Sequence, residues 1–325
     1  MELVPRRRLE MFSGRAHPEL AEEIASCLGV RLGEANLEEF ADGEMHCRFG
    51  ESIRGADVFL IQPHAAPVHK SLLEQLIMID AAKRASAKRI TAVCPYYGYS
   101  RQDRKSSGRE PITAKLVADL LTAAGANRVV SLDLHSGQIQ GFFNFPVDHL
   151  TAAPVIADYL RREDPSDICI VSPDAGRMKV AERFSQVLGT DMAIVRKLRP
   201  KGSQNQVQAL EVIGAESVEG RRCVVIDDMI DTAGTVCAAA ERLVASGASE
   251  VWAVATHGVL SGPAIDRLKN APIDRVVLTN TLPIPDEKRI DKLEVLSVSQ
   301  IIADAIDAVF EDTSVSRIFG GDNLS

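Results

Sequence analysis

Several common signals are absent from this chain of 325 residues. No apolar run approaches the roughly 20 residues that a membrane-spanning helix needs. The first residues, MELVPRRRLEMF, lack the apolar core of a signal peptide. The six cysteines form no C-x-x-C pair and several fall inside predicted strands, so we interpret them as buried free thiols in a reducing compartment. We therefore expect a cytoplasmic protein with no membrane partner.

Two widespread nucleotide-binding signatures are also missing. The sequence contains neither G-x-G-x-x-G nor G-x-x-x-x-G-K-[ST], which argues against the common dinucleotide and P-loop sites. Its 37 Lys and Arg against 45 Asp and Glu give a net charge of −8, so no nucleic-acid partner is expected. With 46% hydrophobic and 25% charged residues, the composition is that of a globular protein long enough for two domains.

Strand and helix patterns alternate along the whole chain. The predicted strands include 57–62, 89–94, 168–172, 224–226 and 275–283, and the predicted helices include 18–29, 71–86, 112–125, 151–164 and 301–312. Two similar strand–acid–turn segments, 128–140 and 222–234, suggest that one α/β domain has been duplicated. We expect two doubly wound, mainly parallel sheets flanked by helices, with sites at the carboxyl ends of the strands.

The segment CVVIDDMIDTAGT, residues 223–235, carries the strongest chemical signal. A short apolar strand leads through Asp227, Asp228 and Asp231 into a small, hydroxyl-rich turn, and a helix is predicted to follow and to end at Gly247. Such a turn presents backbone N–H groups and the positive end of the helix dipole to a phosphate. The carboxylates accept hydrogen bonds from sugar hydroxyls or bind a metal. A phosphorylated sugar fits this combination; the simpler alternative is an acidic turn that caps a helix.

Three further loops carry candidate binding groups. Residues 95–113 combine tyrosines and basic side chains, which suits an adenine ring and a polyphosphate, although a solvated loop has the same composition. His135 lies two residues after Asp133, so the two could hold a divalent ion, or the histidine is structural. The basic run 196–201 is typical of a flap over an anion or of a solvated surface. Asp42-Gly43 predicts a hairpin turn.

These segments together closely resemble the ribose-phosphate pyrophosphokinases. The resemblance extends from about Phe12 to Phe319, and we place it in the phosphate-activated class. The matching segments are FADGE (40–44), RGADVFLIQ (54–62), PYYGYSRQDRK (95–105), REPITAKLVADLL (109–121), DLHSGQIQGFF (133–143), PVDHLTA (146–152), SPDAG (172–176), DDMIDTAGT (227–235) and THGVLSGPAI (256–265).

The resemblance implies two tandem phosphoribosyltransferase-like domains. They would span residues 1–152 and 153–310, with residues 311–325 packing back on the first. The implied reaction transfers the diphosphoryl group of Mg-ATP to the 1-hydroxyl of ribose 5-phosphate, giving AMP and 5-phosphoribosyl 1-diphosphate for nucleotide biosynthesis. The resemblance further implies Mg²⁺ as the cofactor and inorganic phosphate as the activator. It also implies a homo-oligomer in which dimers assemble into a hexamer.

The resemblance also assigns roles to individual residues. The ATP contacts are Phe40, Asp42, Gly43 and Glu44, acting in a neighbouring subunit's site, together with Arg101 and Gln102. The metal-binding residues are His135 and Asp174, and the catalytic flap residues are Lys197 and Arg199. The ribose 5-phosphate contacts are Arg199, Asp227, Asp228, Asp231, Thr232, Ala233, Gly234 and Thr235, and an allosteric anion site contains Ser52 and Arg54.

The chain departs from the family pattern at a few positions near these residues. Arg177 stands where a second glycine usually follows SPDAG, and Arg196 and Leu198 differ from the usual flap residues. These departures keep open a second hypothesis, a non-catalytic regulatory subunit, although such a chain has no need to retain Lys197 and Arg199. A third hypothesis is a phosphoribosyltransferase that consumes the activated sugar. It would share 227–235 but has no need of FADGE or of two domains.

Overall fold

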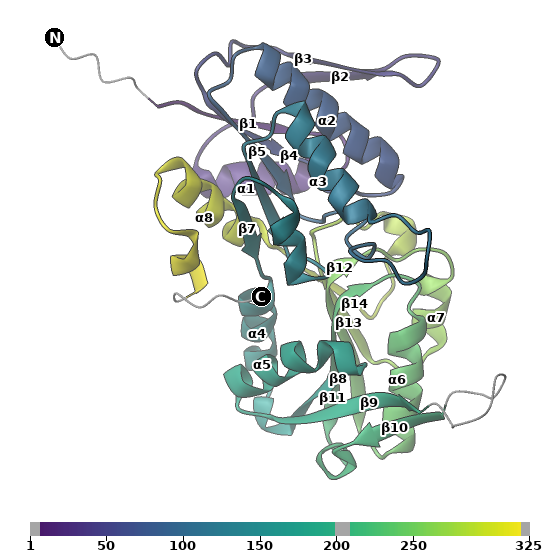
Figure 1. Cartoon of the computed structure of the whole chain (residues 1–325). Helices are drawn as coiled ribbons and strands as arrows, with labels where there is room; N and C mark the ends of the chain where they lie inside the picture. Colours follow the sequence, from purple (N-terminus) through teal and green to yellow (C-terminus); the bar gives the residue numbers. More distant parts are fainter. Residues whose placement is uncertain (1–6, 199–208, 320–325) are drawn as a thin grey trace. The chain divides into compact units, whose positions relative to one another are not determined.

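The structure is a computed structural model of the chain and describes residues 7–198 and 209–319. The chain folds into two compact units, whose elements are labelled in Figure 1. The first unit is Met1–Thr151, Thr281–Pro283 and Val298–Ser325, and the second is Ala152–Asn280 and Ile284–Ser297. The first boundary falls next to the expected one. The final helix differs, because it packs with the first unit whereas the sequence predicts that residues up to 310 belong to the second.

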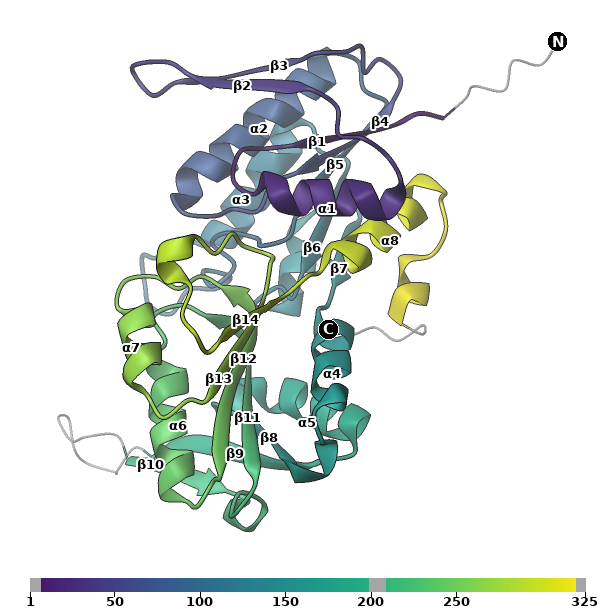
Figure 2. The ribbon, with the colours of Figure 1, turned by 180° about the vertical axis from the view of Figure 1, so that it is seen from behind.

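The first unit contains one parallel sheet and a separate hairpin. Its strands are β1 (Leu9–Ser13), β2 (Ala35–Glu39), β3 (Met45–Phe49), β4 (Asp57–Ile61), β5 (Arg89–Cys94), β6 (Arg128–Leu132) and β7 (Val147–Leu150). Its helices are α1 (Pro18–Leu28), α2 (Val68–Arg84), α3 (Thr113–Ala124), α8 (Ser299–Phe310) and the short 3-10 helices η1 (Gly137–Phe142) and η6 (Val315–Phe319). The sheet order is β1-β4-β5-β6-β7, with every pair parallel. Figures 1 and 2 show α2 and α3 on one face of this sheet and α1 and α8 on the other.

Burial on both faces explains the apolar strands of the first unit. All five residues of β4 are buried, as expected for a central parallel strand covered by helices on both sides. Helix α1 begins with Pro18 and ends at Gly29, whose φ of 66° lies in the left-handed region that closes a helix. Strands β2 and β3 pair antiparallel, with Glu39 opposite Met45, which confirms the predicted hairpin around Asp42-Gly43.

The second unit is built on a seven-stranded sheet. Its strands are β8 (Ile168–Ser172), β9 (Asp191–Leu198), β10 (Ala209–Ile213), β11 (Arg222–Ile230), β12 (Glu250–Gly258), β13 (Arg275–Thr279) and β14 (Leu293–Leu296). Its helices are α4 (Ala153–Arg162), α5 (Met178–Leu188), α6 (Gly234–Ala245), α7 (Ala264–Asn270) and the 3-10 helices η2 (Pro165–Asp167), η3 (Ala175–Arg177), η4 (Ala215–Ser217) and η5 (Asp286–Lys288). The order is β10-β9-β8-β11-β12-β13-β14, and only β9 and β10 pair antiparallel.

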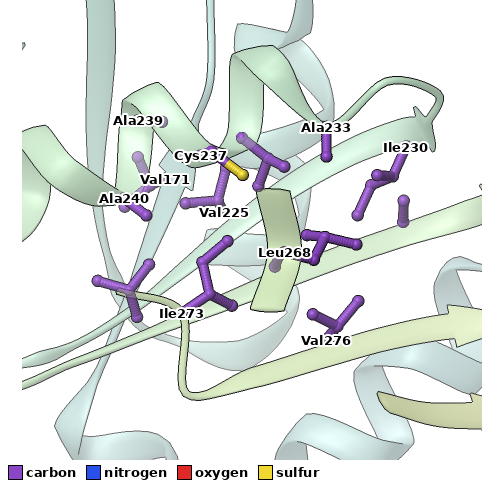
Figure 3. Close-up of a cluster of buried hydrophobic side chains, with 14 of the residues drawn as sticks. Val171, Val225, Ile230, Ala233, Cys237, Ala239, Ala240, Leu268, Ile273 and Val276 are labelled. Carbon is purple, nitrogen blue, oxygen red and sulfur yellow. The ribbon is translucent and has the colours of Figure 1, made fainter. Parts of the chain in front are cut away.

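A core of small and branched side chains joins helices α6 and α7 to this sheet. Figure 3 shows Val225 of β11, Ala239 and Ala240 of α6 and Leu268 of α7 meeting in this cluster. The alanines of α6 let the helix lie close against β11 and β12. This packing fixes the start of α6 relative to the end of β11, and the turn joins these two ends.

The two sheets repeat one strand order. Strands β1-β4-β5-β6-β7 correspond to β8-β11-β12-β13-β14. In each unit an antiparallel pair, β2 with β3 or β9 with β10, lies along the chain between the first and the second of these strands. The duplication is therefore confirmed, but the equivalence of 128–140 with 222–234 is wrong. Strand β11 is second in its order and matches β4, whereas β6 is fourth and matches β13. The two segments look alike because buried parallel strands share an apolar pattern wherever they lie in a sheet.

The six cysteines are all free thiols, as predicted. Four of them are buried, Cys47 is half-buried, and Cys27 is exposed, so the expected burial fails at that position. No helix within residues 7–198 and 209–319 is long and apolar enough to cross a membrane.

Candidate active site

The acidic segment lies at the carboxyl end of β11. The strand is longer than predicted, because its pairing with β12 continues to Ile230 opposite Gly258. Its pairing with β8 ends earlier, at Val225 opposite Val171. Asp227 and Asp228 therefore belong to the strand, at the point where β8 has ended, and their side chains are mostly buried. This is the edge of a parallel sheet at which ligands bind.

An arginine from the neighbouring strand–turn–helix contacts both carboxylates. Arg177 Nε lies 3.2 Å from Asp227 Oδ1, and Arg177 Nη2 lies 2.6 Å from Asp228 Oδ2. Burial raises the pKa of Asp227 above its ordinary value, the adjacent Asp228 raises it further, and Arg177 opposes both effects. The sequence singled out Arg177 only as a departure from a family pattern and missed this contact.

The turn after β11 leaves a helix N-terminus open to a ligand. Ala233 has a φ of 60°, in the left-handed region where a side chain is strained, and α6 begins at Gly234 without a side-chain N-cap. The first-turn N–H groups of α6 and its dipole are thus available to an anion. The predicted helix is confirmed, but it starts earlier, so the turn is tighter than the sequence suggested.

Two residues that the sequence analysis missed hold this turn in place. The side chain of Arg267 on α7 donates to the carbonyl oxygen of Thr232 at 2.9 Å. The hydroxyl of Ser261 donates to the carboxylate of Asp231, and the Ser261 N–H donates to the Asp231 carbonyl oxygen at 2.9 Å. Asp231 therefore anchors the loop after β12.

Asp174 caps the helical turn after β8. Its Oδ1 accepts the N–H groups of Gly176, at 2.8 Å, and of Arg177, at 3.1 Å. His135 follows β6 in the first unit and is half-buried. Among the described residues, no group of three or more His, Cys, Asp and Glu side chains could hold a metal ion.

The predicted flap falls at the edge of what the structure describes. Lys197 lies in β9, with its backbone opposite Leu210 of β10. Its side chain and the whole of Arg199 lie outside the described part of the chain, so their predicted roles stay predictions.

The hairpin of the first unit presents its predicted residues to solvent. Phe40 is 51% exposed, and Asp42, Gly43 and Glu44 are exposed as well. The turn is closed by Phe40 N–H donating to the Glu44 carbonyl at 2.8 Å and by Glu44 N–H donating to Asp42 Oδ1 at 3.1 Å. Asp42 thus shapes the tip, and the Phe40 ring lies 6.1 Å from the His46 ring of the same hairpin while about half of its surface stays exposed.

Arg101 and Gln102 lie in the loop between β5 and α3, and both are exposed. Gln102 joins this loop to the start of α3, because its carbonyl accepts the Ala114 N–H at 3.1 Å and its Oε1 accepts the Thr113 hydroxyl at 2.6 Å. At the start of the same loop, the Gly98 N–H donates to Nδ1 of the fully buried His64 at 2.9 Å. No sequence pattern singles out His64.

A cavity of about 320 Å³ in the first unit contains the two residues of the predicted allosteric site. The residues that line it with Ser52 and Arg54 are Cys47, Arg48, Phe49, Glu51, Ile53, Ala81 and Ala85. Its two arginines and its hydroxyl are groups that bind an anion, whereas the carboxylate of Glu51 opposes one.

Comparison with known proteins gives consistent matches along the chain. A model of the N-terminal domain of ribose phosphate pyrophosphokinase matches residues 9–125, and a phosphoribosyl synthetase-associated domain matches residues 172–320. A ribose-phosphate pyrophosphokinase of Streptomyces avermitilis is 56% identical over 314 residues, which are 96% of each chain. One of Caldanaerobacter subterraneus subsp. tengcongensis is 54% identical and covers 96% of this chain and 98% of that protein.

A solved structure extends the match to the fold. The crystal structure of phosphoribosylpyrophosphate synthetase from Mycobacterium smegmatis is 49% identical to this chain, with a TM-score of 0.89. The match covers 94% of this chain and 100% of that one.

Proposed function

This chain belongs to the ribose-phosphate pyrophosphokinase family, and from that premise we propose that its acidic strand end and the turn behind it bind ribose 5-phosphate. The chain is an enzyme of this class, which transfers the diphosphoryl group of ATP to the 1-hydroxyl of ribose 5-phosphate. The relatives match over nearly the full chain and favour the enzyme over a regulatory subunit.

The observation that carries the sugar site is the pairing of two kinds of group within residues 227–235. The N–H groups at the start of α6 and the small side chains of Thr232 to Thr235 suit the 5-phosphate. Asp227 and Asp228 precede them on β11 and suit the adjacent ring hydroxyls, because carboxylates are acceptors. Asp231 supports the turn through Ser261.

The residues proposed to bind ATP all lie in the first unit, in the loop after β5 and in the β2–β3 hairpin. Arg101 and Gln102 would contact the nucleotide from the loop after β5, and Phe40 with Glu44 would contact the adenine and ribose of ATP bound to a neighbouring subunit. An exposed aromatic ring at a hairpin tip supports this role, since it provides a stacking surface for a base. The assignment requires a homo-oligomer, for which we propose dimers that assemble into a hexamer.

Magnesium fits the residues present. Mg²⁺ keeps several waters and binds through one or two protein groups plus substrate phosphates, so the lack of a cluster of three ligands among the described residues is compatible with it. His135 in the first unit and the outer oxygen of Asp174 in the second are each a group that would hold a magnesium ion. When bound, the ion supplies positive charge to the transferring group.

The residues of the chain provide binding and charge rather than a covalent intermediate. Phosphoryl-type transfer depends on in-line placement and on neutralising spread negative charge. Lys197 and Arg199 would supply that charge at the transferring group, with Arg199 also close to the sugar phosphate. The cavity with Ser52 and Arg54 would bind inorganic phosphate as an activator.

The activity is tested by incubating the protein with ATP, Mg²⁺, ribose 5-phosphate and inorganic phosphate. AMP and 5-phosphoribosyl 1-diphosphate are expected in equal amounts. Asp228→Asn is expected to raise the KM for ribose 5-phosphate and to leave the KM for ATP unchanged. No product over a wide range of phosphate concentrations would refute the activity.

The role of Lys197 is tested separately. Lys197→Ala is expected to lower kcat by about two orders of magnitude or more while both KM values stay close to wild type, because its charge acts on the transition state. Steady-state kinetics measure this, with Lys179→Ala on the exposed start of α5 as the control. An unchanged kcat would remove Lys197 from the mechanism.

A further inference from the structure

We propose that Arg177 is a positioning residue of the sugar site: its guanidinium holds Asp227 and Asp228 as a fixed pair of acceptors for two adjacent hydroxyls of a pentose phosphate. The inference rests on the function proposed above, because it concerns the same two carboxylates. It assigns to Arg177 the discrimination between sugar phosphates that carry both hydroxyls and those that lack one.

The guanidinium spans two separate carboxylates rather than chelating one. Its Nε faces Asp227 Oδ1 at 3.2 Å and its Nη2 faces Asp228 Oδ2 at 2.6 Å. The Asp228 N–H also donates to Asp227 Oδ1 at 2.8 Å. One rigid planar group therefore sets the separation of the two carboxylates.

A carboxylate can accept several hydrogen bonds at once. An ionised carboxylate has two oxygens and about four acceptor positions, and Arg177 engages one oxygen of each. The guanidinium need not leave when hydroxyls bind. It is thus placed as part of the site's framework.

Burial explains why the pair needs a cation. The side chains of Arg177, Asp227 and Asp228 are 16%, 22% and 7% exposed. Two carboxylates this buried repel each other, and the pKa of Asp227 is raised by its burial and by Asp228 while Arg177 opposes that rise. A protonated carboxyl loses an acceptor position, so the guanidinium favours the state in which both side chains accept hydrogen bonds.

The backbone of Arg177 is itself fixed. Its N–H donates to Asp174 Oδ1 at 3.1 Å, so the residue is tied to the end of β8 before α5 begins. Strand β8 pairs with β11 up to Val171 opposite Val225. The arginine ends the turn that follows β8 and the acidic pair lies on β11, so both are attached to neighbouring strands of one sheet.

The charge of the trio suits an anionic sugar. Arg177 places a positive charge against the two carboxylates and so offsets negative charge beside a substrate that carries a phosphate. Removal of Arg177 is thus expected to weaken binding of ribose 5-phosphate in two ways, through repulsion and through loss of geometry.

The test compares Arg177→Gln and Arg177→Lys with the wild type. Arg177→Gln is expected to raise the KM for ribose 5-phosphate about tenfold, equivalent to about 1.4 kcal/mol, with kcat and the KM for ATP within about threefold. Arg177→Lys keeps the charge but not the planar guanidinium, so its KM for ribose 5-phosphate should lie between those of the wild type and Arg177→Gln. Arg161→Gln is the matched control, since Arg161 pairs with Asp158 on the exposed face of α4 in the same unit.

Specificity gives a second readout. Calorimetry would measure binding of ribose 5-phosphate and of 2-deoxyribose 5-phosphate to each variant. The wild type should favour ribose 5-phosphate, because a site built for two hydroxyls is left with an unpaired acceptor by the analogue. In Arg177→Gln this preference should fall by about an order of magnitude, a change that a general loss of stability does not produce.

Asp228→Asn separates failure of this inference from failure of the sugar site. If Asp228→Asn raises the KM for ribose 5-phosphate while Arg177→Gln leaves both KM and preference unchanged, the sugar site stands and the role of Arg177 is overturned. A lower KM in Arg177→Gln overturns it too, since the guanidinium would then compete with the sugar. If Arg177→Gln does not fold, a wild-type KM in Arg177→Lys overturns the proposal. If Asp228→Asn has no effect, the sugar site itself is wrong.

Discussion

At the scale of single residues, the buried polar network under the loop after β5 explains how that loop is held. His64 and Gln75 are both fully buried. Since the Gly98 N–H donates to His64 Nδ1, the proton of the ring is on Nε2, which donates to Gln75 Oε1 at 2.9 Å. A neutral histidine satisfies both partners, and burial lowers the pKa of His64 to about 4.

This histidine predicts a specific dependence of stability on pH. The unfolded chain binds the proton of residue 64 near the ordinary histidine pKa and the folded chain only near 4, so the folded state loses stability as pH falls between these values. The loss is up to about 3 kcal/mol and is complete only below the folded pKa. Above the ordinary pKa the contribution is fully present.

The measurement is urea denaturation of wild type and His64→Gln at about pH 7 and about pH 5. His64→Gln should be less stable than wild type by roughly 1–3 kcal/mol near neutrality, because it disturbs buried hydrogen bonds, and the difference should shrink at the lower pH. His69→Gln, at an exposed histidine of α2, is the control. A difference that does not change with pH would contradict the neutral assignment.

The sequence identified the candidate residues of the site better than the residues that organise them. Asp227 and Asp228 follow an apolar strand, and that pattern alone predicts their place at its end. Arg177 lies 50 positions before Asp227 (227 − 177), and only the pairing of β8 with β11 brings it to the carboxylates. Arg267 reaches Thr232 in the same way, through the packing of α7. Such contacts depend on strand order, which local patterns do not contain.

At the scale of elements, long and regular segments were predictable and short ones were not. Helices α1 and α3 have apolar spacing and a glycine at the end, and β4 is a continuous apolar run. Strand β7, Val147–Leu150, and helix α7 are too short to show a period, and the sequence missed both. Strand β11 extends beyond its apolar part because β12 continues to pair with it, which outweighs the weak strand propensity of aspartate.

The amino ends of β11, β12 and β13 contain a second polar cluster with no predicted role in binding. The Trp252 ring lies between two guanidinium groups, with Arg222 Cζ 4.7 Å and Arg275 Cζ 4.2 Å from its centroid. Glu250 accepts from Arg222 Nε at 2.9 Å and from Trp252 Nε1 at 3.2 Å. Because ligands bind at the opposite, carboxyl ends of parallel strands, we expect this cluster to serve stability alone.

Trp252→Leu is therefore expected to lower the free energy of unfolding by roughly 2–5 kcal/mol and to leave the KM for ribose 5-phosphate unchanged. Trp252→Phe keeps a ring between the arginines and should cost less. Circular dichroism should follow the urea denaturation, since Trp252 is the only tryptophan of the chain. A raised KM at wild-type stability would show that the two ends of the sheet are coupled.

At the scale of the whole molecule, one strand order has been used for two purposes. Strand β4 and its counterpart β11 both lead into a helix. After β4 the connection contains His64, which is buried and hydrogen-bonded within the unit, whereas β11 ends in carboxylates and an uncapped helix. The same position thus serves internal packing in one unit and the proposed sugar site in the other.

The proposed action of the hairpin in a neighbouring subunit predicts complementation between two impaired variants. Phe40→Ala would remove a contact that one subunit makes with ATP bound to the neighbouring subunit. Asp228→Asn would impair the sugar site within the subunit that carries the substitution. In a mixed pair, one composite site carries both changes and the other carries neither. Random pairing should therefore restore about a quarter of the wild-type activity, if each variant alone is nearly inactive.

Subunits would be mixed under conditions that allow exchange, with light scattering to confirm that both variants assemble like wild type. Mixing Phe40→Ala with Lys197→Ala gives a second pair, since Lys197 also belongs to the unit that contains the sugar site. Activity equal to the mean of the two separate variants would contradict the exchange of hairpins and place Phe40 in the site of its own subunit. Recovery in both mixtures, and none when Asp228→Asn is mixed with Lys197→Ala, would identify the hairpin as the element that the partner supplies.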